Sequence, residues 1–351
     1  MAAAAAAVAG DASAKRRKSV IGTHSGTFHC DEALGCYLLR QTPAFRDAEI
    51  VRSRDPAVLA TADVVIDVGG VYEPDAQRFD HHQRGFAETF GHGFATKLSS
   101  AGLVYKHYGR AIVAQRMGLG EDHADVTAVW LELYKSFIEA VDGVDNGVNQ
   151  YESDKPPRYV VNTSLPARVG QLNPQWSDPY TDESLLEGFL KAVELTGKEF
   201  DDALTYVSRY WLPAKSLVAA AVAGRHEVDA SGRIIKLAQA RRCGGVPWKQ
   251  HLYALEEALG LTSDACILFV LYEDERENKW RLQAVSVAAG SFENRKSIGP
   301  QAWRGLRDAA LSEASGVPGC VFVHAGGFIG GNDTYEGALQ MARMSLAVAD
   351  A

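Results

Sequence analysis

Histidines and aspartates cluster in three short stretches within the first quarter of the chain. The stretches are IGTHSGTFHCDEALG, VVIDVGG and RFDHHQRGF, and in each the polar residues stand at or beside the end of an expected buried strand. A doubly wound α/β fold binds its ligands just beyond the carboxyl ends of its strands, where residues far apart in sequence converge. Imidazole nitrogens and carboxylate oxygens gathered there would form a metal site. The residues concerned are His24, His29, Asp31, Asp67, Asp80, His81 and His82.

The first two motifs place candidate metal ligands in a loop and at the end of a strand. His24, His29 and Asp31 stand in a loop between a strand and a helix, where an imidazole at the strand end and two groups at the helix start can share one crevice. Asp67 closes an apolar strand, which is costly unless a cation meets the carboxylate. A solvated loop histidine or a turn aspartate is the alternative at each single position.

The third motif contains two adjacent histidines. Neighbouring side chains on an extended segment point to opposite faces, so His81 and His82 cannot both bind one ion from a regular strand. We therefore expect one histidine to bind metal and the other to face the substrate. Asp80 is suited to orient an imidazole by accepting its second N–H.

Short β-branched runs alternate with helical stretches from residue 19 onward, which predicts an α/β fold with a doubly wound, mostly parallel sheet. We expect helices at residues 31–41 and 99–117, and a long amphipathic helix that ends in AVDGVDNGVNQ. The expected strands are residues 20–24, 49–54, 64–68 and 78–80.

The second half predicts a separate, mixed α+β domain. Residues 151–182 are rich in Pro, Asn, Asp and Ser and predict a long connection. Helical stretches around 183–199 and 201–223 follow, with Pro213 breaking or kinking the second. Strands are expected at 266–272, 280–287 and 320–324, before a glycine-rich turn and a final helix. The expected division is a tail (1–19), a metal-binding catalytic domain (20–180), a helical linker (181–225) and an accessory domain (226–351).

Composition narrows the class of protein. A chain of 351 residues exceeds what one core usually supports, and no segment approaches the ~20 apolar residues that a membrane span needs. Five scattered cysteines without C-x-x-C spacing argue against a disulfide scaffold or a zinc ribbon and indicate a reducing compartment. A net charge of -8 gives no global attraction to polyphosphate, so a nucleic acid would have to be held locally.

The first nineteen residues form an alanine-rich tail that ends in the basic cluster Lys15, Arg16, Arg17 and Lys18. Poor acidic content fits a transit peptide, and a compact basic cluster fits nuclear import. We therefore expect a mitochondrial or nuclear location, or both, with a solvated tail on a cytoplasmic protein as the alternative.

The motifs THSGTFHCDE, DVGG, DHH and DNG resemble those of the DHH phosphoesterase superfamily, which includes single-strand exonucleases, nanoRNases and manganese pyrophosphatases. The chain closely resembles one branch, the Myg exonuclease family, also described as metal-dependent protein hydrolases of unknown substrate. This likeness runs from Ile21 to Leu346 and includes DAEIVRSRDP, TKLSSAGL, WRGLRD and GCVFVHAGGFIGG.

The resemblance implies a DHH-like domain that binds two divalent cations. His24 matches the first histidine of the opening motif and should bind one metal, while Asp31 matches its second aspartate and should bind the other. Asp67 corresponds to the bridging aspartate. His81 matches the ligand histidine of the DHH triplet, and His82 matches its phosphate-facing neighbour.

Two positions need further argument. His29 stands where relatives usually carry an aspartate, so the site loses one negative charge and should hold one ion less tightly or favour a more nitrogen-loving metal. Mn²⁺ is the expected metal, with zinc and nickel as competitors. The stretch VDGVDNG offers two aspartates; we prefer Asp145 as the ligand, with Asp142 as the alternative.

Two cations sharing Asp67, about 3.5–4 Å apart, could polarise a bridging water into a hydroxide that attacks a phosphodiester in line. His82 would neutralise a non-bridging oxygen as charge accumulates, with Asp80 in the supporting role described above. Arg84 and Lys97 are candidate anion partners, and surface charge is the alternative for both.

The stretch HAGGFIGG resembles the glycine-rich motif with which the accessory domain of DHH exonucleases binds a nucleic-acid end. It makes His324, Gly326 and Gly327 candidate substrate-binding residues, with a simple turn as the alternative.

Three functions therefore compete. The first, which the resemblance favours, is a manganese-dependent 3′-to-5′ exonuclease acting on single-stranded RNA. The second is a phosphohydrolase of a small phosphoanhydride or a cyclic dinucleotide. The third is a non-catalytic protein that keeps its metals for stability, against which the complete ligand set argues.

Overall fold

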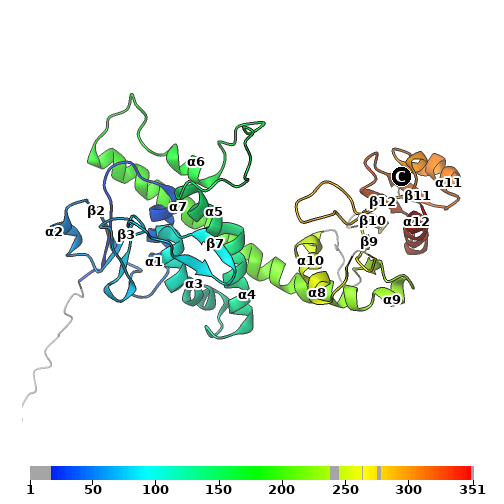
Figure 1. Cartoon of the computed structure of the whole chain (residues 1–351), viewed down its shortest axis with the longest axis horizontal. Helices are drawn as coiled ribbons and strands as arrows, with labels where there is room; N and C mark the ends of the chain where they lie inside the picture. Colours follow the sequence, from blue (N-terminus) through cyan, green and yellow to red (C-terminus); the bar gives the residue numbers. More distant parts are fainter. Residues whose placement is uncertain (1–16, 238–244, 263, 275–277, 349–351) are drawn as a thin grey trace, which may run out of the picture. The chain divides into compact units, whose positions relative to one another are not determined.

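The computed structural model describes residues 17–237, 245–262, 264–274 and 278–348. Contacts divide the chain into two units, Met1–Leu204 and Thr205–Ala351 (Figure 1). The boundary falls inside residues 181–225, the stretch expected to be a helical linker. Of the basic cluster expected to target the chain, Arg17 and Lys18 lie within the described residues, and Arg17 pairs with Asp63 at 2.7 Å.

A five-stranded sheet forms the base of the first unit. Its spatial order is β2-β1-β3-β5-β4, and its pairs are parallel except β4–β5. The strands are β1 (Val20–Thr23), β2 (Glu49–Arg52), β3 (Val64–Ile66), β4 (Tyr72–Glu73) and β5 (Arg78–Phe79). The predicted α/β class is confirmed, and the doubly wound arrangement stays a prediction. The four predicted strands each end one or two residues early, because the chain leaves the sheet where the polar residues begin.

Helices α1 (Cys30–Arg40) and α3 (Ser100–Met117) pack together on one face of this sheet. Gly35 of α1 allows the close approach, since a Cβ there would stand 2.9 Å from Ile66 Cδ1 on β3 and 3.7 Å from Val104 on α3. The short helix α2 (Pro56–Leu59) follows β2, and Leu59 packs with Ala62 and Val65 in a small separate cluster.

The predicted long amphipathic helix contains one irregular turn. Helix α4 (Ala124–Leu133) continues through a π-helical turn (Tyr134–Ile138) into α5 (Glu139–Asp145). A hairpin that the sequence did not predict, β6 (Thr89–Gly91) and β7 (Phe94–Lys97), packs against this turn, with the rings of Phe90 and Tyr134 stacked 3.7 Å apart. The π-helical turn precedes the part of the run that carries Asp142 and Asp145, and such turns are frequent at functional sites.

The long connection contains the short helix α6 (Leu165–Gly170) and leads into α7 (Asp182–Tyr206), which continues through residue 200, where a break between two helices was expected. A π-helical turn (Val207–Trp211) separates α7 from α8 (Leu212–Ala223). Pro213 has no N–H for the preceding helical turn, so the predicted irregularity occurs as a π-helical turn just before the proline. Phe189 and Phe200 of α7 are buried in the first unit, and Val218 and Val222 of α8 are buried in the second.

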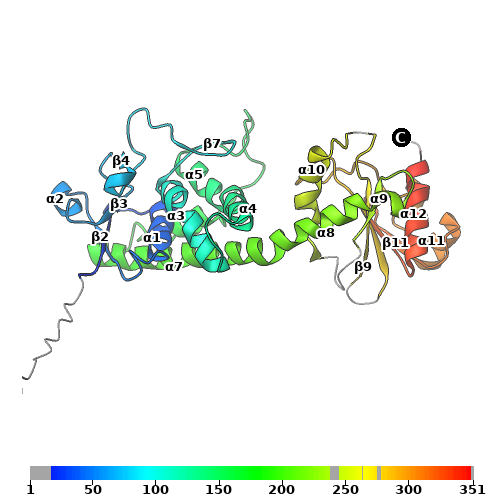
Figure 2. The same cartoon turned by 90° about the horizontal axis from the view of Figure 1, so that it is seen from below.

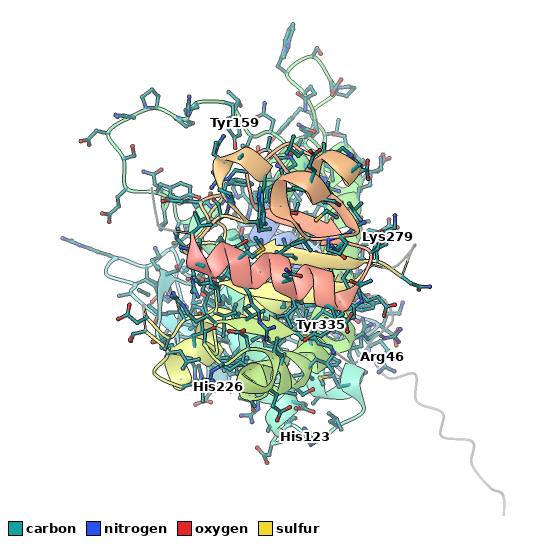
Figure 3. All side chains as sticks on the ribbon, turned by 90° about the vertical axis from the view of Figure 1, so that its right-hand side faces the viewer. Arg46, His123, Tyr159, His226, Lys279 and Tyr335 are labelled. Carbon is teal, nitrogen blue, oxygen red and sulfur yellow. The ribbon has the colours of Figure 1, made fainter. Side chains whose placement is uncertain are left out.

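The second unit is a mixed sheet in the order β11-β12-β10-β9-β8. Only β8–β9 pair in parallel within it. Helices α8 and α10 contribute to a hydrophobic cluster on one face and α11 and α12 to a cluster on the other (Figure 2; Figure 3 looks onto α12, which begins at Tyr335). The strands are β8 (Ile234–Lys236), β9 (Phe269–Glu273), β10 (Trp280–Ala284), β11 (Cys320–Val323) and β12 (Ile329–Asn332). The helices are α9 (Arg225–Val228), α10 (Trp248–Ala258), α11 (Asp308–Ser315) and α12 (Tyr335–Ala347).

Strand β12 corrects the prediction of a glycine-rich turn between residue 324 and the last helix. Gly330 and Gly331 carry no β-branched signal, yet both lie inside the sheet. A Cβ at Gly330 would stand 3.0 Å from the Phe322 carbonyl oxygen, and one at Gly331 would stand 2.7 Å from Arg281 Nη1. The glycines therefore allow close packing within the sheet.

Among the described residues, no helix combines the length and apolar character needed to cross a bilayer.

Candidate metal centre

The carboxyl ends of three neighbouring parallel strands carry the histidines and aspartates of the sequence motifs. His24 follows β1, Asp67 follows β3, and Asp80, His81 and His82 follow β5. The start of α1 and the end of α5 complete the same cluster. The first supplies His29, Asp31 and Glu32, and the second supplies Asp145.

Asp67 lies at the centre of the cluster. Its Oδ2 stands 3.3 Å from His24 Nε2, and its Oδ1 stands 3.2 Å from His81 Nε2. His24 Nε2 also lies 3.0 Å from Glu32 Oε1, and His81 Nε2 lies 3.2 Å from Asp145 Oδ2. One carboxylate thus contacts an imidazole on either side, as a bridging ligand would.

The backbone at Asp67 adopts an uncommon conformation. Its φ of 58° lies in the left-handed region, which aspartate tolerates better than most residues, and Gly69 and Gly70 after it also have positive φ. The chain therefore turns sharply at the end of β3, and the carboxylate stays 3% exposed at the sheet edge.

A second group forms around the start of α1. His29, Asp31 and Asp145 each offer a ligand atom, and these three atoms lie within 4.8 Å of one another. Asp31 Oδ2 accepts hydrogen bonds from the Ser100 hydroxyl at 2.7 Å and the Ser100 backbone N–H at 3.3 Å. The other carboxylate oxygen, Asp31 Oδ1, makes no hydrogen bond of standard geometry with the described residues and is available as a ligand.

Three buried polar atoms of the cluster make no hydrogen bond of standard geometry with the described residues: Asp31 Oδ1, Asp67 Oδ1 and His81 Nε2, the last two of which face each other at 3.2 Å. A buried polar atom without a partner costs about 1–3 kcal/mol, more when charged. Carboxylate oxygens and an imidazole nitrogen are the donors that divalent manganese and related metals accept. The residues present therefore fit a bound divalent cation.

The protonation of the cluster reflects its burial. Burial, followed by repulsion from Asp31, raises the pKa of Asp145 to about 9, and burial raises the pKa of Asp31 as well. Burial works to raise the pKa of Asp67, but the close contacts of its two oxygens with the His24 and His81 imidazoles hold it at about 2. So many carboxylates cannot all ionise together without cations between them.

The imidazoles compensate for part of this charge. Burial lowers the pKa of His24, but hydrogen bonds to Asp67 and Glu32 outweigh it and raise the value to about 10. At His81, burial also works to lower the pKa, but the close contact with the Asp67 carboxylate outweighs it and raises the value to about 9. A cation bound at these ring nitrogens would replace their protons.

Glu32 is the residue of this cluster that the sequence reasoning missed. It is completely buried, and its Oε1 and Oε2 accept the His29 backbone N–H at 2.9 and 3.0 Å. It groups with His24, His29 and Asp67 as a candidate ligand, and burial raises its pKa to about 8. Its adjacency to Asp31 in HCDE was the available signal, but a glutamate in a first helical turn is so common that it did not stand out.

The two aspartates of VDGVDNG have different contact partners in the structure. Both Asp142 carboxylate oxygens are occupied: Oδ1 accepts from the Ser99 hydroxyl and from the backbone N–H groups of Ser99 and Gly102, and Oδ2 accepts from the Tyr134 hydroxyl. Asp142 therefore caps the start of α3. Asp145 faces His81 and Asp31, which makes it the better candidate ligand.

His81 and His82 differ in exposure. The His81 side chain is 5% exposed and faces Asp67 and Asp145, whereas that of His82 is 62% exposed. We expected the two side chains to point to opposite faces of a strand, and this was wrong: their rings lie 4.2 Å apart. The reason is that β5 ends at Phe79, so neither histidine lies in a strand. Asp80 Oδ1 lies 2.8 Å from His82 Nδ1, and its Oδ2 accepts the Gly70 N–H.

The two basic candidates lie in different surroundings. The Lys97 carbonyl accepts from Asn146 Nδ2 at 2.9 Å, and Asn146 Oδ1 lies 3.3 Å from His81 Nδ1, so β7 is tied to the cluster. Lys97 Nζ stands 5.7 Å from the centre of the Phe86 ring. Arg84 is exposed two residues after His82, and nothing in the structure assigns it a role.

A cavity of about 500 Å³ adjoins the cluster. His29, His82 and Asp145 line it on the metal side, and Ser164, Pro166 and Ala167 line it from α6. Its size suits a nucleotide-sized ligand beside the candidate ligands.

The predicted substrate residues lie in the second unit. His324 Nδ1 accepts the Gly326 N–H at 3.0 Å, which closes a tight turn after β11. Gly327 has a φ of +64°, and a Cβ there would stand 3.0 Å from Ser297 and 3.2 Å from Arg304 Nε. The turn therefore requires glycine, and exposed His324 and Gly326 stand on it.

Comparison with known proteins gives one family over nearly the whole chain. Residues 20–346 match the model of the MYG1 exonuclease family, described as uncharacterised protein family UPF0160. A human relative named MYG1 exonuclease is 50% identical over 332 residues, covering 93% of this chain and 85% of the relative. MYG1 proteins of Caenorhabditis elegans and Saccharomyces cerevisiae are 46% and 43% identical, covering 95% and 93% of this chain and 96% and 95% of the relatives. No solved structure matches the chain.

Proposed function

The chain belongs to the MYG1 exonuclease family, and from this we propose that it is a metal-dependent exonuclease that degrades single-stranded RNA from its 3′ end. The observation that carries the proposal is the buried cluster of imidazoles and carboxylates around Asp67, three of whose polar atoms make no hydrogen bond of standard geometry within the described part of the chain. The name of the human relative supports a nuclease, and the likeness to DHH phosphoesterases supports a doubly wound catalytic domain.

We assign two divalent cations, Mn²⁺ by preference, to this cluster. His24, His29 and Glu32 would hold one, Asp31, His81 and Asp145 would hold the other, and Asp67 would contact both. Bound there, the cations would supply a nucleophile at neutral pH and neutralise charge on the phosphate. A charged carboxylate set suits Mn²⁺, while the imidazoles would also admit zinc in vitro.

The chain's own side chains would then position the scissile phosphate. His82 is exposed, and Asp80 holds its Nδ1, so its Nε2 is left to face a non-bridging phosphate oxygen. Lys97 would add positive charge from the β7 side. The buried ligands have few rotamers open to them, which keeps the site in place without movement.

Residues of the second unit would determine from which end the RNA is degraded. His324, Gly326 and Gly327 form a tight turn whose exposed groups can approach a terminal ribose closely. We assign the free 3′ end to this turn.

The test is a digestion of single-stranded RNA labelled at its 5′ end, with Mn²⁺ and in EDTA. Removal from the 3′ end should produce a descending ladder, because the label stays on the shortening strand. An RNA ending in a 3′-phosphate should resist. A released labelled mononucleotide at the earliest times would indicate attack from the 5′ end and refute the polarity.

The tail before the fold would direct the protein to mitochondria or the nucleus. Its alanine-rich composition and the run Lys15, Arg16, Arg17 and Lys18 support this proposal. A fusion of residues 1–19 to a fluorescent protein should concentrate in one of these compartments. A diffuse cytoplasmic signal would refute the proposal.

A further inference from the structure

Trp176 is almost completely solvent-exposed, although tryptophan is among the residues that gain most from burial. Its exposure is 99% of the reference value for this residue type. A buried aromatic side chain removes about 150–250 Å² from water, so an unburied one forgoes a large stabilisation. An exposed indole offers a partner both a broad apolar face and an N–H donor, which is why tryptophan is enriched at interfaces.

The turn that presents Trp176 is ordered by hydrogen bonds. The Asp178 N–H donates to the Gln175 carbonyl at 2.9 Å, and Asp178 Oδ2 accepts the Gln175 N–H at 2.8 Å. Gln175 Nε2 donates to the Asn173 carbonyl at 3.1 Å. The indole is thus held in water on a defined turn, and its binding surface is formed in advance.

This turn is attached to the loop that carries the candidate metal ligands. Asn173 Oδ1 accepts the Phe28 N–H at 3.0 Å, and Asn173 Nδ2 donates to the Phe28 carbonyl at 2.9 Å. His29 is the next residue after Phe28. Trp176 follows Asn173 by three residues, so the Cα atoms of Asn173 and Trp176 can be at most about 11 Å apart. Tyr180, 61% exposed, adds a contact of 3.4 Å between its hydroxyl and Thr27 Oγ1.

The segment around Trp176 also differs in charge from the rest of the chain. Residues 155–177 contain Lys155, Arg158 and Arg168 and no acidic residue, in a chain with a net charge of -8; Asp154 and Asp178 flank the stretch, and Arg168 pairs with Glu199 at 2.8 Å. Tyr159 is 76% exposed on the same segment and is labelled in Figure 3. Exposed aromatic rings with interspersed basic residues are the combination that binds single-stranded nucleic acid through stacking and backbone charge.

We propose that Trp176, with Tyr180, forms a stacking surface for the unpaired bases of single-stranded RNA beside the metal centre. The inference rests on the proposed function and adds the residues that select single strands. Phe28, to which the Trp176 turn is hydrogen-bonded through Asn173, lines the cavity together with His29 and Asp145. Because every base has an aromatic face, the surface should favour single strands over duplexes with little preference for sequence.

Binding of a short, fluorescently labelled single-stranded RNA with phosphorothioate linkages tests the proposal by fluorescence anisotropy. Trp176→Ala should weaken binding by about 5- to 150-fold, the range expected for one lost stacking contact. Trp176→Phe should recover most of the affinity. Phe292→Ala is the matched control, because Phe292 is equally exposed (101%) and lies in the second unit. Metal content should be the same in all four proteins.

Other outcomes distinguish the possible errors. Equal affinity of wild type and Trp176→Ala for the single strand would overturn the stacking surface, as would an equal loss of affinity for a duplex. Self-association that disappears in Trp176→Ala while RNA affinity stays unchanged would assign the surface to a second copy of the chain and overturn the inference. A wild-type protein that neither binds nor cleaves RNA would instead overturn the proposed function on which the inference rests.

Discussion

Three aspartates close to one another in the first unit have different surroundings, and these surroundings determine what each can do. Asp67 keeps a pKa of about 2 between two imidazoles, while burial raises that of Asp145 to about 9 and that of Asp142 to about 7. Sequence motifs predicted Asp67, His24 and His81 because those residues end strands. They could not separate Asp142 from Asp145, since both occupy the last turns of one helix and only the packing against α3 distinguishes them.

Substitution of these two aspartates should separate support of the fold from metal binding. Asp142→Asn should keep metal and lower the free energy of unfolding only modestly, since an amide oxygen still accepts from Ser99 and Gly102. Asp142→Ala should cost about 2 kcal/mol or more, because it leaves buried donors unpaired. Asp145→Asn should lose metal without loss of apo-protein stability, since removal of a carboxyl group whose ionised form is disfavoured costs the fold little. Elemental analysis and denaturant unfolding measure both effects; metal loss only in the Asp142 variants would reverse the assignment.

The adjacent histidines give a second contrast at the same scale. His81→Ala should lose metal, because its Nε2 faces Asp67 and Asp145. His82→Ala should keep metal and lower turnover by about 10²–10³-fold, the usual cost of one lost oxyanion partner. Metal content and kcat on single-stranded RNA check this. Loss of metal from the His82 variant alone would mean that their roles are exchanged.

The elements that position these residues were predictable where hydrophobic periodicity is strong. The first four parallel strands and helices α1 and α3 began within one residue of the predicted position, because apolar runs specify buried elements. The sequence missed the β6–β7 hairpin and β12. Gly330 and Gly331 have low strand propensity. Their place in the sheet depends on close packing against Phe322 of β11 and Arg281 of β10, which the local sequence does not show.

Close packing at β12 makes a prediction about stability. Gly330→Ala should lower the free energy of unfolding by about 1–3 kcal/mol, because the new Cβ would press against the Phe322 carbonyl in a packed sheet. Gly120→Ala is the control, since a Cβ at Gly120 meets nothing within 4 Å. Thermal unfolding of the two variants measures the difference. Equal melting temperatures would show that β12 can move away from β11 at no cost.

At the scale of the whole molecule, length and composition predicted two units, and the contacts divide the chain at Leu204 and Thr205. The net charge of -8 implies that an RNA substrate is held by a few local groups rather than along a broad basic face. Sequence could not show Trp176 as exposed, since a tryptophan in a polar connection is as often a buried anchor. Its exposure follows from the turn made by Gln175 and Asp178.

Local binding predicts a weak dependence on salt and a strong dependence on chain ends. With about three basic residues contacting phosphates, the slope of log affinity against log salt should be about -2 for a single strand. Circular RNA should survive digestion that removes a linear RNA of the same sequence. A filter-binding series in salt and a parallel digestion check both results. A steep slope together with rapid cleavage of the circle would indicate an endonuclease.

The central claim is that Asp67 serves two cations at once, and metal content per chain tests it most directly. Wild-type protein loaded with Mn²⁺ should bind about two ions per chain by elemental analysis. Asp67→Asn, chosen because asparagine also tolerates the left-handed backbone found there, should lose both ions, whereas His24→Ala should keep about one. Circular dichroism should show both variants folded. Full metal occupancy in folded Asp67→Asn would contradict the shared site and the mechanism built on it.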